Sequence, residues 1–147
     1  MATEETYTVT VLLDVNDLQD VDDRAESRTY IVADRDSGRA VIIDPIIENV
    51  ERDLQTITEL GLTLVFAVET HIHADHITGA SAIKDRTGAQ IVYGGGAAGT
   101  VIGADLFLHE GQELRFGNTA LKALATPGHT DGSVSYTHLT LPTILRV

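Results

Sequence analysis

The chain has 147 residues, with 22 acidic against 10 basic side chains, a formal net charge of −12 and a pI near 4.6. This negative charge argues against binding to nucleic acid or to an anionic membrane surface, because both require a positive field. The length suits one domain, and the absence of cysteine excludes disulfides, thiolate metal sites and cysteine nucleophiles. No apolar run is long enough to span a membrane, and the first residues lack the pattern of a signal peptide, so we expect a cytoplasmic protein.

The first part of the chain is predicted to form strands. Two β-branched segments, 28–33 and 39–43, flank the turn residues Asp34-Arg35-Asp36-Ser37-Gly38, which predicts a hairpin that ends at Asp44-Pro45. An N-terminal strand over 6–13 and an acidic polar loop over 14–26 are predicted to precede it.

The middle of the chain is predicted to alternate helix and strand. Apolar residues recur at helical spacing from Asn49, a predicted cap, to Leu60, and Gly61 stands where a left-handed terminal residue belongs. The apolar run 63–68 then predicts a buried strand. This order predicts a layered α/β protein. Further on, the sequence predicts a helix over 77–87 closed by Gly88, and strands over 90–93, 106–108, 113–116 and 119–125.

The densest metal-ligand chemistry follows the predicted strand 63–68. His71, His73, Asp75 and His76 stand close together there, and His129 follows the last predicted strand. Imidazole and carboxylate groups suit zinc, iron or manganese, and a second metal could lie close to the first. The pattern therefore predicts a metal site at the carboxyl ends of strands.

Other sites are less well supported by the sequence. The segment Gly94-Gly95-Gly96-Ala97-Ala98-Gly99 matches the dinucleotide pattern, but residues 100–105 give no long helix, so a flexible loop is the better interpretation. The chain has no Gly-x-Ser-x-Gly elbow for a serine hydrolase. The isolated His109 is interpreted as a surface residue.

Two motifs resemble those of a known family. Residues 70–76 resemble the Thr-His-x-His-x-Asp-His signature of the metallo-β-lactamase superfamily, and residues 126–130 resemble its second metal motif. With Ile43-Asp44-Pro45 and the wider strings 69–79 and 126–133, the chain most resembles the persulfide dioxygenases within that superfamily. The resemblance runs from about Arg28 to Ser133, and glyoxalase II shares both motifs.

The resemblance to persulfide dioxygenases implies an αβ/βα sandwich with the metal site at one edge between the sheets. In that family one Fe²⁺ is held by two histidines and one aspartate, and His71 and His129 match the two histidines. The implied enzyme oxidises glutathione persulfide with O2 to sulfite and glutathione. Its implied partners are therefore a small thiol substrate and O2, with a homodimer as the expected form of the intact enzyme.

The resemblance to glyoxalase II keeps a second interpretation open. There, His71, His73 and His129 would hold one zinc ion, and Asp75 and His76 would hold a second. Such a dizinc site would hydrolyse a thioester. The first motif contains both ligand sets, so it does not decide between Fe²⁺ and Zn²⁺.

The family continues beyond the second motif, so the resemblance implies that only the N-terminal half of the fold is present. Its aspartate ligand would fall just after Val147, and we expect the second sheet and the glutathione contacts to be absent. One apolar face of the remaining sheet is then expected to be exposed. We therefore predict weak metal binding and no turnover, as a non-catalytic metal-binding fragment would show. Detectable O2 consumption with glutathione persulfide would contradict this.

The C-terminal residues predict a domain boundary. Val134 to Thr143 resemble the translation of a transposase adaptor used in sequencing libraries, GTC TCT TAT ACA CAT CTG ACG CTG CCG ACG, and variable index bases followed by GTG account for the last four residues. We therefore predict a partial domain over 1–133 and an artefactual tail over 134–147. His138 is accordingly excluded as a ligand.

Overall fold

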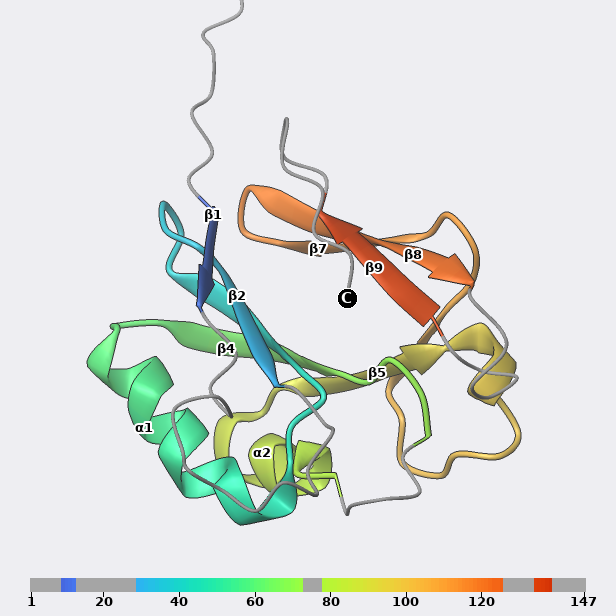
Figure 1. The fold of residues 1–147 in the computed structure, drawn as a ribbon, viewed down its shortest axis with the longest axis horizontal. Coiled ribbons are helices and arrows are strands. Elements are labelled where there is room, and N and C mark those ends of the chain that lie inside the picture. The colour runs from blue at the N-terminus through green and yellow to red at the C-terminus, as the bar shows by residue number, and fades with distance from the viewer. Residues whose placement is uncertain (1–8, 13–28, 73–77, 126–133, 139–147) are drawn as a thin grey trace, which may run out of the picture.

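The computed structural model describes residues 9–12, 29–72, 78–125 and 134–138, and within these the side chains of 29–72 and 78–125. Figure 1 shows three layers, with the two helices below a large sheet and a small sheet above it. The order of strands and helices confirms the predicted layered α/β architecture. None of the helices in these ranges is long and apolar enough to cross a membrane.

The large sheet has six strands in sequence order, and its second half is parallel. The first three strands pair antiparallel, with β2 and β3 forming the predicted hairpin, whereas β3 to β6 pair in parallel. The carboxyl ends of these four parallel strands therefore meet at one edge. The strands are β1 (Val9–Leu12), β2 (Tyr30–Asp34), β3 (Arg39–Ile43), β4 (Thr63–Val68), β5 (Gln90–Gly94) and β6 (Leu106–Leu108).

The two helices connect the parallel strands and cover one face of the sheet. A 3-10 turn (Ile47–Asn49) leads into α1 (Val50–Glu59), and α2 (Ala80–Thr87) connects β4 to β5. Both helices are followed by the predicted left-handed glycines, Gly61 with φ 68° and Gly88 with φ 77°.

Two details of the helix prediction are wrong. Asn49 makes no side-chain capping bond, because it ends the 3-10 turn with φ −104° and ψ 3° instead of the extended conformation that a cap requires. The second helix begins at Ala80 and not at residue 77. Thr78 forms a β-bridge with Ile46, which is incompatible with a helical position.

The small sheet corrects the expectation that one face of the large sheet is exposed. Its strands β7 (Glu113–Phe116), β8 (Thr119–Ala125) and β9 (Val134–His138) pair antiparallel. Alternate residues of β7 and β8 point toward the large sheet and form a shared core with it. That core contains Val32, Val41, Ile43, Val68 and Val92 from the large sheet, and Leu114, Phe116, Leu121 and Ala123 from the small one.

Strand β9 lies in the segment that the sequence assigns to an adaptor-derived tail. Val134 pairs with Ala125, and His138 pairs with Leu121. This pairing has no bearing on the origin of the segment, because the edge of a sheet binds an added strand through backbone hydrogen bonds. The boundary between residues 133 and 134 stays a prediction.

The glycine-rich segment after β5 does not open a dinucleotide-binding helix. Gly95–Ala97 forms a 3-10 turn, and residues 98–105 contain no helix. The His109 ring lies directly against Gly95, where an added Cβ would come within 2.2 Å of its Nδ1. Glycine here permits the close approach of a histidine ring, and the segment is an ordered turn at its start instead of the expected loop.

The turns of the two sheets are joined by the buried Asp34 side chain. Its Oδ2 accepts hydrogen bonds from the Ser37 hydroxyl (2.7 Å) and from the Asn118 amide (2.8 Å) of the β7–β8 turn. Gly117 has φ 61°, and a Cβ there would lie 2.0 Å from Ser37 Oγ. Burial raises the pKa of Asp34, but these hydrogen bonds outweigh burial and hold the pKa below its usual value.

Asp34 is expected to contribute stability that depends on pH. Because its pKa is lowered on folding, the contribution is present above the unfolded pKa of about 3.9 and is lost as the pH falls through the lower folded value. Asp34→Asn should therefore be less stable than wild type at pH 7, and the difference should narrow below about pH 4. Urea unfolding at a series of pH values measures the difference in the free energy of unfolding between Asp34→Asn and wild type.

The matched control for this comparison is Asp36→Asn, which makes the same change at an exposed position of the same turn. Solvent screens an exposed charge, so this variant should differ little from wild type at either pH. If Asp34→Asn lowers the free energy of unfolding by the same amount at pH 7 and at pH 3, the Asp34 carboxylate does not have the lowered pKa that the hydrogen bonds imply.

Candidate metal centre

The candidate metal centre lies at the edge where the parallel strands end. Asp44 follows β3, Glu69-Thr70-His71 follows β4, Gly95 follows β5, and His109 follows β6. Since adjacent parallel strands run in register, residues far apart in the sequence meet there. The structure thus places the first predicted ligand, His71, at the end of a central strand.

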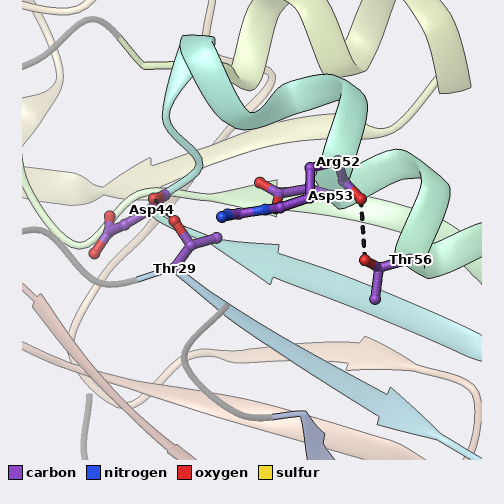
Figure 2. A network of polar contacts seen from close by, with 5 residues as sticks. All are labelled: Thr29, Asp44, Arg52, Asp53 and Thr56. Atoms are coloured by element: carbon purple, nitrogen blue, oxygen red, sulfur yellow. Dashed lines mark hydrogen bonds and ion pairs between the residues drawn. The ribbon is translucent and has the colours of Figure 1, made fainter. Parts of the chain in front are cut away.

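The first supporting element is a backbone corner at Asp44. Among the described residues, Asp44 is the only non-glycine residue with a positive φ, of 53°. Its amide donates to the Val68 carbonyl (2.8 Å), and its own carbonyl accepts from the Thr29 hydroxyl (2.8 Å). Figure 2 shows Thr29 beside this corner. An uncommon backbone conformation held by surrounding bonds is typical of a position with a functional constraint.

The Asp44 carboxylate orients the residues that enter the candidate metal-binding segment. Oδ1 accepts from the Thr70 amide (2.8 Å), and Oδ2 accepts from the Thr70 hydroxyl (2.6 Å). The Thr70 oxygen also lies 2.8 Å from His71 Nδ1. Both Asp44 and Thr70 are buried.

With an ionised Asp44 carboxylate, these contacts favour one tautomer of His71. An ionised carboxylate only accepts hydrogen bonds, so the single Thr70 hydroxyl proton points to Asp44. The contact between Thr70 and His71 then requires a proton on Nδ1, and the lone pair of the neutral ring lies on Nε2. A hydrogen bond through one ring nitrogen that directs the other to a metal is the usual arrangement around metal-binding histidines. The residues present therefore fit a metal at this edge.

A network on α1 lies behind the Asp44 corner. Arg52 donates to Asp53 Oδ1 through Nε (3.2 Å) and Nη2 (3.0 Å), and its backbone carbonyl accepts from the Thr56 hydroxyl. Figure 2 shows the Arg52 guanidinium pointing from α1 toward Thr29 and Asp44. Asp53 is fully buried, and burial raises its pKa against the lowering effect of Arg52. These bonds hold Arg52, Asp53 and Thr56 together within α1, on the side of the helix that faces the corner.

Tyr93, on β5, borders the same edge on the helix side. Burial and the negative charges of Glu69 and Asp44 raise the pKa of Tyr93 to about 12. Its hydroxyl therefore keeps its proton at neutral pH. Glu69 follows β4, which is the neighbour of β5, and Asp44 follows β3, which lies one strand further along the sheet.

Most of the predicted ligands fall outside the described residues. His71 is described, whereas His73, Asp75, His76 and His129 are not. Among the residues that the structure describes, no three histidine or carboxylate side chains come together as a metal site. The ligand assignments from the sequence therefore stay predictions.

Sequence reasoning missed the groups that support His71. The sequence pattern indicates Asp44 as the end of a strand, and Thr70 and Glu69 only as parts of a motif. The sequence does contain a signal for the role of Asp44, because an aspartate and a proline directly follow a predicted strand. A residue that follows a strand of a parallel sheet lies at its carboxyl edge, where ligand-binding sites form.

Most of the chain matches one known protein family. Residues 23–142 match the metallo-β-lactamase superfamily. The chain belongs to this superfamily. The predicted metallo-β-lactamase fold is thereby confirmed, and membership in the superfamily implies a metal cofactor without deciding between iron and zinc.

Relatives in the superfamily include two kinds of enzyme. The chain is 48% identical over 111 residues to mitochondrial persulfide dioxygenase ETHE1 from Mus musculus, covering 74% of this chain and 42% of that protein. It is 33% identical over 112 residues to hydroxyacylglutathione hydrolase from Rhodospirillum rubrum, covering 76% and 43%. The crystal structure of ETHE1 from Myxococcus xanthus matches with TM-score 0.74 and 39% identity, covering 89% of this chain and 53% of that one. The chain thus spans about half the length of these relatives or less.

Proposed function

We propose that this protein acts as a metal-dependent persulfide dioxygenase that oxidises glutathione persulfide to sulfite and glutathione. The observation that carries the proposal is the 48% identity to a persulfide dioxygenase over 111 residues, against 33% identity to a hydroxyacylglutathione hydrolase over 112 residues. The substrates are then a small thiol persulfide and O2. A cytoplasmic location and a homodimer belong to the same proposal.

The proposed metal is Fe²⁺, with His71 and His129 as two of its ligands. His71 would bind through Nε2, because the contact with Thr70 places the proton on Nδ1. Asp44 and Thr70 would hold the ring in that orientation. Two histidines and a carboxylate with open coordination positions suit an iron oxygenase, and the metal would supply those positions to the reactants.

The alternative function is hydrolysis of a glutathione thioester by a dizinc site. The sequence favours it at His73, Asp75 and His76, which a single Fe²⁺ does not require as direct ligands. The identity of 33% to a hydroxyacylglutathione hydrolase supports it as well. In that case His71, His73 and His129 would hold one zinc, and Asp75 and His76 the other.

Metal content and reaction together separate these functions. The protein encoded by the complete gene is purified, its iron and zinc are counted, and it is assayed for O2 uptake with glutathione persulfide and for cleavage of a glutathione thioester. One iron with O2 uptake is the expected result. Two zinc ions with thioester cleavage would establish the hydrolase instead, and bound metal with neither reaction would indicate a non-catalytic metal-binding protein.

A further inference from the structure

Two features that stand apart in the sequence meet at the carboxyl edge of the large sheet. They are the glycine-rich segment after β5 and His109, the residue directly after β6. The His109 ring lies so close to Gly95 that a Cβ on this glycine would collide with the ring atoms Nδ1 and Cε1. The ring therefore leans from the end of β6 over the end of β5, toward the side where His71 follows β4.

The backbone of His109 is held in place by the turn that follows it. Its amide donates to Gln112 Oε1 (2.8 Å), and its carbonyl accepts from the Gln112 amide (3.0 Å). The turn is also bound to β8, because the Gly111 amide donates to the Ala123 carbonyl (2.8 Å) and the Ala123 amide donates to the Gln112 carbonyl (2.9 Å). His109 thus has a defined position at the junction of the two sheets.

The imidazole ring of His109 is oriented by packing alone. Within the described part of the chain it makes no hydrogen bond or ion pair, whereas His71 uses its Nδ1 for the contact with Thr70. The ring edge that carries Nδ1 and Cε1 faces Gly95, so Nε2 lies on the far side from the glycine. The side chain is exposed. A ring with a fixed position and an uncommitted nitrogen can donate a hydrogen bond to a ligand.

The charges at this edge favour an anionic group as the partner of His109. In the described segments that follow β3 to β6, which are 44–49, 69–72, 95–105 and 109–112, the only basic side chains are His71 and His109. His71 is the candidate metal ligand, so His109 is the basic group of these segments that remains for a substrate. A protonated imidazole binds a carboxylate through a charge-assisted hydrogen bond.

The spacing of the strands suits a ligand of the size of a short peptide. Neighbouring strands lie about 4.8 Å apart, so the ends of β4 and β6 are separated by about 10 Å. An extended tripeptide has about the same length. The lean of the His109 ring over β5 shortens the distance that such a ligand has to span from His71.

We infer that His109 is a substrate-binding residue whose Nε2 donates a hydrogen bond to a carboxylate of the peptide part of the substrate. Gly95 is a positioning residue, because any larger side chain there would displace the ring. The inference rests on the substrate class of the proposed function, a glutathione derivative, which the alternative hydrolase shares. It depends neither on the identity of the metal nor on the reaction.

The test measures binding of S-methylglutathione, a stable analogue without a persulfide, to the 147-residue chain by NMR titration. His109→Phe keeps an aromatic ring and removes both ring nitrogens, and it should raise the Kd about two- to fivefold, as loss of an exposed charge pair does. The diethyl ester of the same peptide has no carboxylate, so its Kd should be equal in wild type and His109→Phe. In wild type, the signals of Gly95 and His109 should shift more with the free acid than with the ester.

Gly95→Ala tests the orientation of the ring. The added Cβ should displace the His109 ring and weaken binding of the free acid by a similar factor. In a His109→Ala background no ring remains to be displaced, so the same substitution should cause no further loss. An undiminished loss in that background would overturn the role of Gly95.

Arg35→Gln is the matched control for charge. It also removes one positive charge, but from the exposed turn between β2 and β3, at the opposite edge of the sheet. Salt screens exposed charges that are farther apart than about 10 Å, so this variant should bind both peptides as wild type does.

Four results would overturn the inference. These are wild-type affinity for the free acid in His109→Phe, an equal loss for the free acid and the ester, an equal loss in Arg35→Gln, and no binding of the peptide by the wild-type chain. Failure of the proposed function would look different, because a protein with neither O2 uptake nor thioester cleavage can still bind the free acid more tightly than His109→Phe does.

Discussion

Asp44→Asn is expected to raise the Kd for Co²⁺ by about 10- to 100-fold, the usual cost of losing a group that orients a metal-binding histidine. The asparagine keeps one oxygen for the Thr70 amide and tolerates the positive φ, so the fold should persist. Its amide nitrogen cannot accept from the Thr70 hydroxyl. The hydroxyl proton is then free to turn to His71 Nδ1, which favours the ring tautomer with a proton on Nε2 and so blocks coordination there.

Asp105→Asn is the matched control for this variant. The Asp105 carboxylate also accepts from a backbone amide, that of Ile91 (2.8 Å), and from a side chain, Lys84 Nζ (2.5 Å). It stands just before β6, away from the carboxyl edge of the sheet. Metal affinity should be unchanged in this control. Wild-type affinity in Asp44→Asn would contradict the proposed role of Asp44 and Thr70.

Phe116→Ala is expected to lower the free energy of unfolding by about 3–5 kcal/mol, as truncation of a buried aromatic side chain usually does. Phe116 is 1% exposed and belongs to the core shared by the two sheets. This loss of free energy of unfolding measures how much the packing between the small and the large sheet stabilises the fold. Urea unfolding followed by circular dichroism gives the value.

Phe107→Ala provides the comparison for this core. Phe107 lies on β6, is only partly buried, and packs at the margin of the helix-side core. Its truncation should cost clearly less than that of Phe116, because the cavity opens partly to solvent. If the two variants lose the same free energy of unfolding, or if Phe116→Ala loses little, the apolar face of the large sheet is exposed and not covered by the small sheet.

That expectation failed for a physical reason. The sequence shows strands over 113–116 and 119–125, but their alternation states only that one face of each is apolar, without naming what that face covers. In the structure, the apolar face of the small sheet packs on the large sheet. Its residues Leu114, Phe116 and Leu121 share one core with Val32 and Val41. A short antiparallel sheet is therefore enough to bury a surface that was assigned to missing residues.

The sequence by itself determined the local features of this protein. The hairpin around Asp34–Gly38, the helix ended by Gly61 and the buried strand 63–68 follow from short-range patterns of turn residues and apolar spacing. Four candidate ligands, His71, His73, Asp75 and His76, are equally visible because they stand close together in the chain. Both kinds of information lie within about one helix or strand length.

Only the tertiary structure decided what orients His71, the candidate ligand that it describes. Asp44 and Thr70 are 26 residues apart, and they meet because β3 and β4 are parallel neighbours in register. The same arrangement brings Pro45 to Gly79 and buries Glu69 beside β5. No local pattern encodes which strands become neighbours, since that choice depends on packing across the whole sheet.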